Sequence, residues 1–160
     1  MRPIEATYDE IAAAIRKSNP ERIVWTNGCF DVFHRGHLEL LRYCRSVAGP
    51  KGIVVVGMND DDGVMRIKGP SRPIVDCESR ALIVAACRFV DHVMTFSEDT
   101  PIDAIRALRP DAIVKGSEYL EAHVVGRELA PVLLAPQIDG WSTTKLMEKI
   151  IGLGREGVPT

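Results

Sequence analysis

Short apolar runs alternate with amphipathic segments along almost the whole chain, and this alternation limits the folds open to it. The runs lack the period-two pattern of a strand with one wet face, so each is expected to be a strand buried on both faces. Five expected strands lie at residues 23–25, 53–58, 90–96, 112–114 and 132–134. Buried strands separated by helices are typical of parallel sheets. The pattern predicts an α/β fold with one doubly wound, parallel, five-stranded sheet in a single domain.

Helix signals fill the intervals between these strands. Thr7 and Glu10 have capping-box spacing at the start of the first helix, and Thr100-Pro101 has the composition of another helix start. The expected helices cover 7–18, about 36–48, 76–85, 101–108, a weaker 123–129, and a last helix that begins at Ser142. We expect the acidic residues 60–62 to form a solvated turn. Residues 1–22 are expected to be a helical extension, 23–151 the main domain, and the glycine-containing segment 152–160 a flexible tail.

Composition excludes several classes of protein. The 160 residues carry 20 Lys and Arg against 22 Asp and Glu, a net charge of −2, so no general basic surface is available for nucleic acid. The net charge does not exclude a small phosphorylated ligand, because such a ligand needs only a few local cations. No apolar run approaches the roughly 18 residues of a membrane span, and the N-terminus lacks the apolar core of a signal peptide, so we expect a cytoplasmic location. The four cysteines have no paired spacing and are expected to be reduced.

The loop after the first expected strand carries the strongest chemical signal. It reads TNGCFDVFHRGH and matches neither G-x-G-x-x-G nor Walker A, but it places H-x-G-H at the mouth of a helix. Backbone N–H groups there favour an anion, His34 and His37 can add donors, and Gly36 allows close approach of a ligand. Two other interpretations stay open: one histidine solvating the helix end and the other buried, or a metal site with Cys29 and Cys44. The spacing matches no zinc pattern, which ranks the metal interpretation last.

This loop, together with WSTTK at 141–145, resembles the cytidylyltransferase-like nucleotidyltransferase superfamily, and the resemblance covers about residues 23–151. It implies a Rossmann-like form of the predicted sheet and makes 23–151 a nucleotidyltransferase domain. The segments KGPSRP, FSEDTP and RPDAIVKGSEY look like the heptose 1-phosphate adenylyltransferases, in their stand-alone form because only one helix precedes the domain. The segments RFVDHV and STTKL look instead like glycerol-3-phosphate cytidylyltransferase. The longer matches favour the adenylyltransferases.

The resemblance implies transfer of AMP from ATP to a heptose 1-phosphate with release of pyrophosphate. The product would be ADP-heptose for lipopolysaccharide or surface glycan synthesis. One alternative is a cytidylyltransferase that uses CTP and glycerol 3-phosphate or another polyol phosphate. A second alternative is a nucleotide-binding module without catalysis. We expect Mg²⁺ to be held mainly by the nucleotide phosphates, with no protein metal site. The resemblance also implies a homodimer; no nucleic acid or membrane partner is expected.

The same resemblance assigns roles to individual residues. His34, His37 and Lys68 are expected to be catalytic, with Lys68 on a mobile loop. Residues expected to bind the nucleotide are Thr26, Asn27, Gly28, Cys29, Phe30, Gly36, Lys115, Gly116, Tyr119, Ser142, Thr143 and Thr144. Residues expected to bind the acceptor are Asp31, Asn59, Arg72 and Arg88. For Asp31 a turn residue is an equal interpretation, and for the two arginines an ordinary exposed side chain also stays open.

Overall fold

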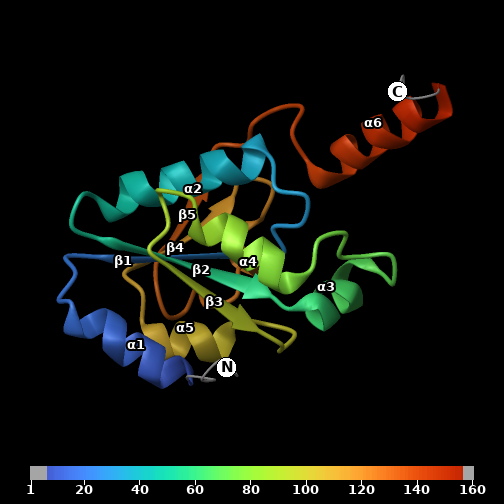
Figure 1. The fold of residues 1–160 in the computed structure, drawn as a ribbon. Helices are drawn as coiled ribbons and strands as arrows, with labels where there is room; N and C mark the ends of the chain where they lie inside the picture. The colour runs from blue at the N-terminus through green and yellow to red at the C-terminus, as the bar shows by residue number, and fades with distance from the viewer. Residues whose placement is uncertain (1–6, 157–160) are drawn as a thin grey trace.

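The computed structural model describes residues 7–156 and contains one five-stranded sheet. Its strand order is β3-β2-β1-β4-β5, and every neighbouring pair is parallel (Figure 1). The strands are β1 (Ile23–Gly28), β2 (Ile53–Asn59), β3 (His92–Phe96), β4 (Ala112–Gly116) and β5 (Val132–Ala135). Neighbouring β1 and β4 are far apart in sequence, because the chain winds first toward β3 and then returns to the other side of β1. This arrangement confirms the predicted doubly wound α/β fold.

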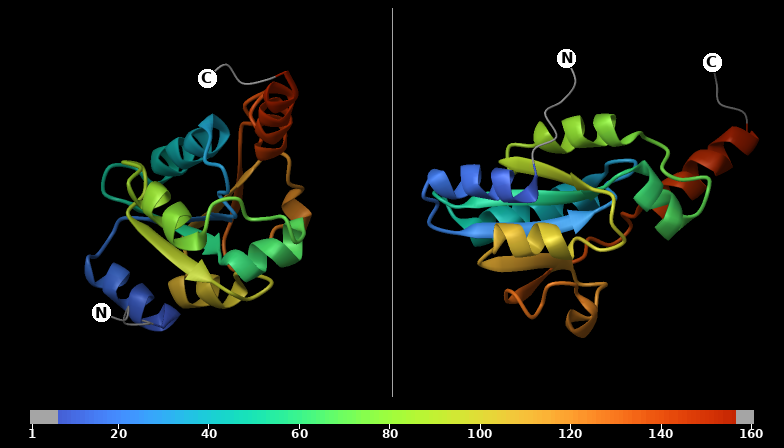
Figure 2. Two further views of the ribbon diagram at one scale, coloured as in Figure 1. Left: turned by 45° about the vertical axis from the view of Figure 1, so that its right-hand side comes forward. Right: turned by 90° about the horizontal axis from the view of Figure 1, so that it is seen from below.

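Helices cover both faces of the sheet (Figure 2). They are α1 (Tyr8–Lys17), α2 (Arg35–Ala48), α3 (Asp61–Lys68), α4 (Cys77–Ala85), α5 (Ile102–Leu108) and α6 (Thr143–Glu156). One core cluster joins α1 and α5 to the sheet, and the other joins α2 and α4 to the opposite face. Adjacent residues of one strand belong to different core clusters: Val24 packs in the cluster on the α2–α4 side of the sheet, and Trp25 packs in the cluster on the α1–α5 side. Burial on both faces explains why the strands read as continuous apolar runs.

The N-terminal helix is part of the main fold rather than an extension of it. Ala12 and Ile15 are buried in the same cluster as Ile105 and Leu108 of α5. Thr7 caps α1 in a complete capping box with Glu10, as its spacing predicts. The expected boundary at residue 22 therefore does not separate two structural units.

Three expected elements differ in the structure. Residues 61–68 form α3 instead of lying in a solvated turn, because the Asp60 carboxylate accepts from Gly63 N at 2.7 Å and Val64 is buried below it. The weaker helix expected at 123–129 is a single 3-10 turn, Glu121–His123. Gly126 interrupts that segment with a φ of 87°.

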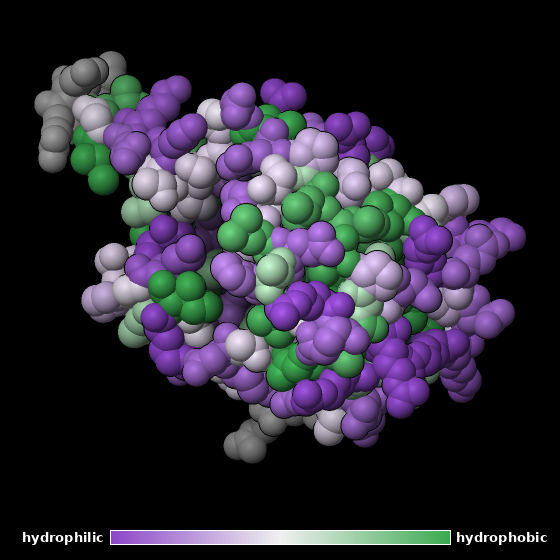
Figure 3. Space-filling view, turned by 180° about the vertical axis from the view of Figure 1, so that it is seen from behind, coloured by the Kyte–Doolittle hydropathy of each residue, from purple (hydrophilic) through white to green (hydrophobic). Residues whose placement is uncertain are grey.

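The third difference concerns the C-terminal segment. Helix α6 continues to Glu156, so residues 152–156 are helical and not a tail, while 157–160 lie outside the described residues. The helix projects from the body of the molecule (Figures 1 and 3). Ile150, Ile151 and Leu153 are each at least half exposed on it. Within residues 7–156 no helix has the length and apolar character needed to cross a membrane.

Carboxylates fasten the amino ends of the strands. Asp111 accepts a hydrogen bond from Ile23 N at 2.7 Å, which ties the start of β4 to the start of β1. Asp91 does the same for β2, accepting from Val54 N at 2.7 Å, and it is also paired with Arg45 of α2. These side chains lie at the edge of the sheet opposite the carboxyl ends of the strands.

A close approach between β1 and β2 fixes the central side chain of the sheet. A Cβ atom on Gly57 would lie 2.2 Å from Cζ2 of the fully buried Trp25, so only glycine leaves room for the indole. The indole Nε1 donates to Asn27 Oδ1 at 3.3 Å. Asn27 stands where β1 ends, so core packing is connected to the edge of the sheet at which ligands of such folds bind.

Candidate active site

A cleft of about 530 Å³ opens beyond the carboxyl ends of β1 and β4. This is the point where the winding of the sheet reverses, and ligands of doubly wound sheets bind there. The loops after β1 and β4, the end of α3 and the start of α6 all contribute to its wall. All of the residues predicted for the site line this cleft except Thr26 and Arg88.

The two histidines of H-x-G-H cap the helix that begins between them. His34 is the N-cap of α2, and its Nδ1 accepts from Gly36 N at 3.0 Å. His37 Nδ1 accepts from His34 N at 3.4 Å, which completes a capping box made of two imidazoles. A neutral imidazole that accepts at Nδ1 carries its proton on Nε2. Both rings therefore keep an Nε2–H donor for a ligand.

Burial keeps both imidazoles uncharged. It lowers the pKa of His34, and burial together with the neighbouring His34 lowers the pKa of His37 to about 3. The two rings stack at 3.9 Å between centroids, and Phe30 and Phe33 pack at 5.2 and 5.5 Å from the His37 ring. Two neutral donors beside the N-terminus of α2 can stabilise phosphate oxygens without bringing a formal charge.

Gly36 allows the start of α6 to approach the start of α2. A Cβ on Gly36 would lie 2.9 Å from His34 Cε1 and 3.2 Å from the carbonyl oxygen of Trp141. Any larger residue would push these groups apart. The H-x-G-H and STTK segments are therefore neighbours across one cleft, although about a hundred residues separate them.

Lys115 is a buried cation at the base of the cleft. Its Nζ donates to the carbonyl oxygen of Asn27 at 2.8 Å and lies 4.4 Å from the ring centroid of Tyr119. Burial lowers the pKa of Lys115 to about 8, against the opposing effect of Glu118. An incoming polyphosphate would favour the charged ammonium.

Lys68 and Arg72 add positive charge at the opening of the cleft. Lys68 was expected on a mobile loop; the structure instead places it as the last residue of α3, exposed at the rim. Arg72 lies on the segment that follows and is mostly buried. Because α3 is a capped helix, it presents Lys68 from a defined element rather than from a free loop.

Asp31 does not have the free carboxylate expected of an acceptor-binding residue. It is 1% exposed, and it accepts from Arg72 Nε at 2.6 Å, Ile74 N at 2.9 Å and Val75 N at 3.0 Å. Burial alone would raise the pKa of Asp31, but these donors outweigh it and lower the pKa. The carboxylate is thus ionised and used within the protein, and this corrects the expectation of direct acceptor contact.

The three hydroxyls at the start of α6 have different partners. Ser142 Oγ accepts from Lys145 N at 3.2 Å, as an N-cap does, and keeps its own proton for a ligand. Thr143 Oγ1 donates to the carbonyl oxygen of Asp31 at 3.0 Å, so its proton is not available to a phosphate in this arrangement. Thr144 is exposed and lines the cleft. In this arrangement Ser142 and Thr144 are therefore better placed than Thr143 to donate to a phosphate.

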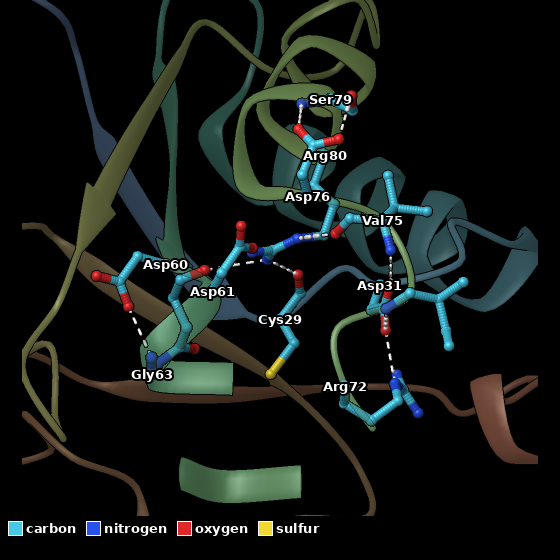
Figure 4. A network of polar contacts seen from close by, with 12 residues as sticks. Cys29, Asp31, Asp60, Asp61, Gly63, Arg72, Val75, Asp76, Ser79 and Arg80 are labelled. Carbon is cyan, nitrogen blue, oxygen red and sulfur yellow. Dashed lines mark hydrogen bonds and ion pairs between the residues drawn. The ribbon is translucent and has the colours of Figure 1, made fainter. Parts of the chain in front are cut away.

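A fully buried arginine that the motifs do not mark organises the wall of the cleft (Figure 4). Arg80 of α4 donates to the carbonyl oxygens of Val75, Cys29 and Asn59, and it pairs with Asp61 at 2.7 Å. No motif quoted from the sequence includes Arg80. The signal that could have found it is a charged residue directly before the apolar run ALIVA of the same helix, because a cation that is buried there needs polar partners.

Two predicted site residues lie elsewhere. Thr26 is fully buried within β1, one residue too early to reach the cleft. Arg88 is exposed, with its guanidinium 5.4 Å from the Phe89 ring centroid, and it does not line the cleft. Several cleft residues are not assigned to the site by the motifs: Thr100 and Pro101, which belong to the FSEDTP segment, and His123, Val124, Val125, Pro136, Gln137 and Ile138, which come from loops without a recognisable pattern. Their position after β3, β4 and β5 is the signal that could have identified them.

Family comparison agrees with this architecture. The cytidylyltransferase-like family model matches residues 25–149, most of the chain. The chain belongs to the cytidylyltransferase-like family. Membership makes it a nucleotidyltransferase, and the matched range includes both H-x-G-H and STTK.

Several curated relatives are similar over nearly the whole nucleotidyltransferase. The bifunctional protein HldE of Sulfurimonas denitrificans is 42% identical over 148 residues, covering 91% of this chain and 30% of that protein. Its counterpart in Helicobacter pylori strain J99 is 45% identical over 133 residues, covering 82% of this chain and 28% of that protein. The nucleotidyltransferase thus spans about a third of the length of these relatives.

Solved structures show the same fold at low identity. A lipopolysaccharide core biosynthesis protein from Thermoplasma volcanium aligns with a TM-score of 0.53 at 23% identity, covering 83% of this chain and 88% of that one. A pantoate-beta-alanine ligase from Francisella tularensis aligns with a TM-score of 0.56 at 12% identity, covering 94% and 78%. At these identities the likeness concerns the fold alone.

Proposed function

We propose that the nucleotidyltransferase transfers the adenylyl group of ATP to a heptose 1-phosphate and releases pyrophosphate, giving an ADP-heptose for surface glycan synthesis. The observation that carries the proposal is that His34 and His37, each with Nδ1 used as an acceptor in the α2 cap, line one cleft together with the start of α6. The KGPSRP and VKGSEY segments and the similarity to HldE proteins support the choice of acceptor.

In the proposed reaction, a phosphate oxygen of the acceptor forms a bond to the α-phosphorus of ATP. The bond from that phosphorus to the bridging oxygen breaks, and the electron pair leaves with pyrophosphate. No covalent intermediate with the protein is needed. Negative charge grows on the α-phosphoryl and leaving oxygens, so positioned donors lower the barrier.

The cleft supplies such donors from three sides. His34 and His37 donate from Nε2 to the phosphoryl oxygens, and the N-terminus of α6 with Ser142 receives the β- and γ-phosphates. Lys68 at the end of α3 adds a cation at the rim. Lys115 holds the backbone of Asn27, next to which the nucleotide would lie.

Mg²⁺ is proposed to enter with the nucleotide. Among residues 7–156 no three His, Cys, Asp or Glu side chains are grouped as ligands for a metal. Of the three acidic residues that line the cleft, Asp31, Asp99 and Glu118, two are paired within the protein, Asp31 with Arg72 and Asp99 with Arg66. Phosphate oxygens and water are the ligands that fit Mg²⁺ here, and the ion would neutralise charge on the triphosphate.

The deciding experiment is a matrix of ATP and CTP against heptose 1-phosphate and glycerol 3-phosphate, with pyrophosphate release and product mass as readouts. We expect turnover with ATP and the heptose. Turnover only with CTP and glycerol 3-phosphate would establish the alternative suggested by RFVDHV and STTKL. Nucleotide binding without turnover on any acceptor would favour a binding module. A homodimer and a cytoplasmic location stay predictions.

A further inference from the structure

The backbone around Asp31 is held in an unfavourable conformation. Phe30 and Val32 on either side of it have φ values of 52° and 50°. This left-handed region is disfavoured for all residues with a side chain and most of all for β-branched valine. Such a conformation persists only when surrounding contacts over-determine it. The contacts that do so here converge on Asp31.

Asp31 connects three segments that are distant in sequence. Its carboxylate accepts from Arg72, Ile74 and Val75, which fixes the segment between α3 and α4 (Figure 4). Its carbonyl oxygen accepts from Thr143 Oγ1 at 3.0 Å, which fixes the first turn of α6. One residue of the H-x-G-H loop therefore holds both other walls of the cleft.

Arg72 extends the same connection. One edge of its planar guanidinium is fixed by Asp31 through Nε, and Nη1 lies 3.4 Å from Met147 Sδ on α6. A guanidinium held by two partners has little freedom left to rotate. Arg72 lines the cleft, so Asp31 also determines how this cation faces a bound phosphate.

We infer that Asp31 is a positioning residue that sets the first turn of α6 and the Arg72 guanidinium for binding of the triphosphate. It acts through Thr143 and Arg72 and does not touch the substrate. The inference deepens the proposed function and rests on it in one respect, that the ligand of the cleft is a nucleoside triphosphate.

The first test is a double-mutant cycle on ATP binding, with Asp31→Asn, Arg72→Gln and the double variant. Because both side chains act on one arrangement, we expect each single variant to weaken ATP binding about tenfold and the double variant to be no weaker than either. The matched control is the exposed pair Asp103→Asn and Arg106→Gln on α5, which should change binding less than about twofold.

The second test reads the position of α6 without nucleotide. Trp25 is fully buried and Trp141 is 39% exposed, so acrylamide quenching of fluorescence reports chiefly Trp141. We expect greater quenching in Asp31→Asn and Thr143→Val. Thr143→Ser, which keeps the hydroxyl, should restore the wild-type value.

These readouts separate the inference from the proposed function. If the wild type binds neither ATP nor CTP, the proposed function fails, and the quenching series alone decides the inference. Additive losses in the cycle, or unchanged quenching with a raised KM for the acceptor, would overturn it and make Asp31 an acceptor ligand. If Asp31→Asn does not fold, a cycle of Arg72→Gln with Thr143→Val, which both remove a contact to Asp31, replaces the first test, and the Thr143 pair still provides the quenching readout.

Discussion

Replacing His37 by asparagine tests whether the paired imidazoles act as neutral donors. The amide oxygen of Asn can still accept from His34 N, so the cap of α2 survives while the Nε2–H donor is lost. Removing one positioned donor to a developing oxyanion costs about 2–4 kcal/mol, so we expect kcat to fall about 30- to 1,000-fold. His92→Asn, at the exposed start of β3, is the matched control.

The proximity of the two rings adds to the effect of burial in keeping them uncharged. Two unit charges 3.9 Å apart repel by about 4 kcal/mol at an effective dielectric constant of 20, or about 3 pKa units, so both rings cannot be charged near neutral pH. Burial acts in the same direction and lowers the pKa of His37 to about 3. In NMR titrations of the free protein, we expect the His37 ring to stay neutral down to pH 6 and the His34 ring to titrate below the ordinary histidine range.

The pH dependence of the free energy of unfolding gives an independent check that the pKa of His37 is lowered in the folded protein. The folded pKa of His37 lies below its unfolded value of 6.5, so its contribution is fully present above pH 6.5 and is lost as the pH falls toward 3. At pH 5 the wild type should have lost about 2 kcal/mol through this group, measured by urea unfolding, and His37→Asn should not show that loss. Titration of His37 above pH 6, or an unchanged kcat in the variant, would refute the neutral-donor mechanism.

Three further substitutions test other parts of the structure. Gly57→Ala should lower the free energy of unfolding by about 1–3 kcal/mol, because the added Cβ clashes with Trp25. Adding Trp25→Phe to this variant should recover part of the loss. Equal thermal stability of Gly57→Ala and the wild type would contradict the packing. Lys115→Met should weaken ATP binding in calorimetry yet raise the melting temperature at pH 7, because the folded pKa of about 8 lies below the unfolded value. This gain should shrink between pH 8 and pH 10.5. Arg80→Met should lower the free energy of unfolding, measured in urea, by about 3–5 kcal/mol. Arg80→Lys should not recover this loss, because one ammonium cannot replace a guanidinium with four partners. Wild-type stability of Arg80→Lys would show that the guanidinium is not required.

The sheet and most of the cleft could be predicted because their signals are local. A continuous apolar run marks each buried strand, and H-x-G-H marks the start of a helix, where backbone N–H groups favour an anion. The errors arose where distant segments decide the outcome. Asp31 reads as a turn residue or a ligand until Arg72 and Thr143 are brought beside it. Helix α3 is an exception because its signal is local: Asp60 is an N-cap that accepts from Gly63 N, where the acidic composition alone predicts a solvated turn.

The residues that fasten the sheet and the residues that face the cleft occupy opposite edges of the molecule. Asp91 and Asp111 close the amino ends of the strands, while the loops at the carboxyl ends carry the candidate chemistry. Mutations that alter the choice of base or acceptor can therefore accumulate at one edge with little loss of folding free energy. This separation offers a physical route by which specificity for the nucleotide and the acceptor can change during evolution while the fold is kept.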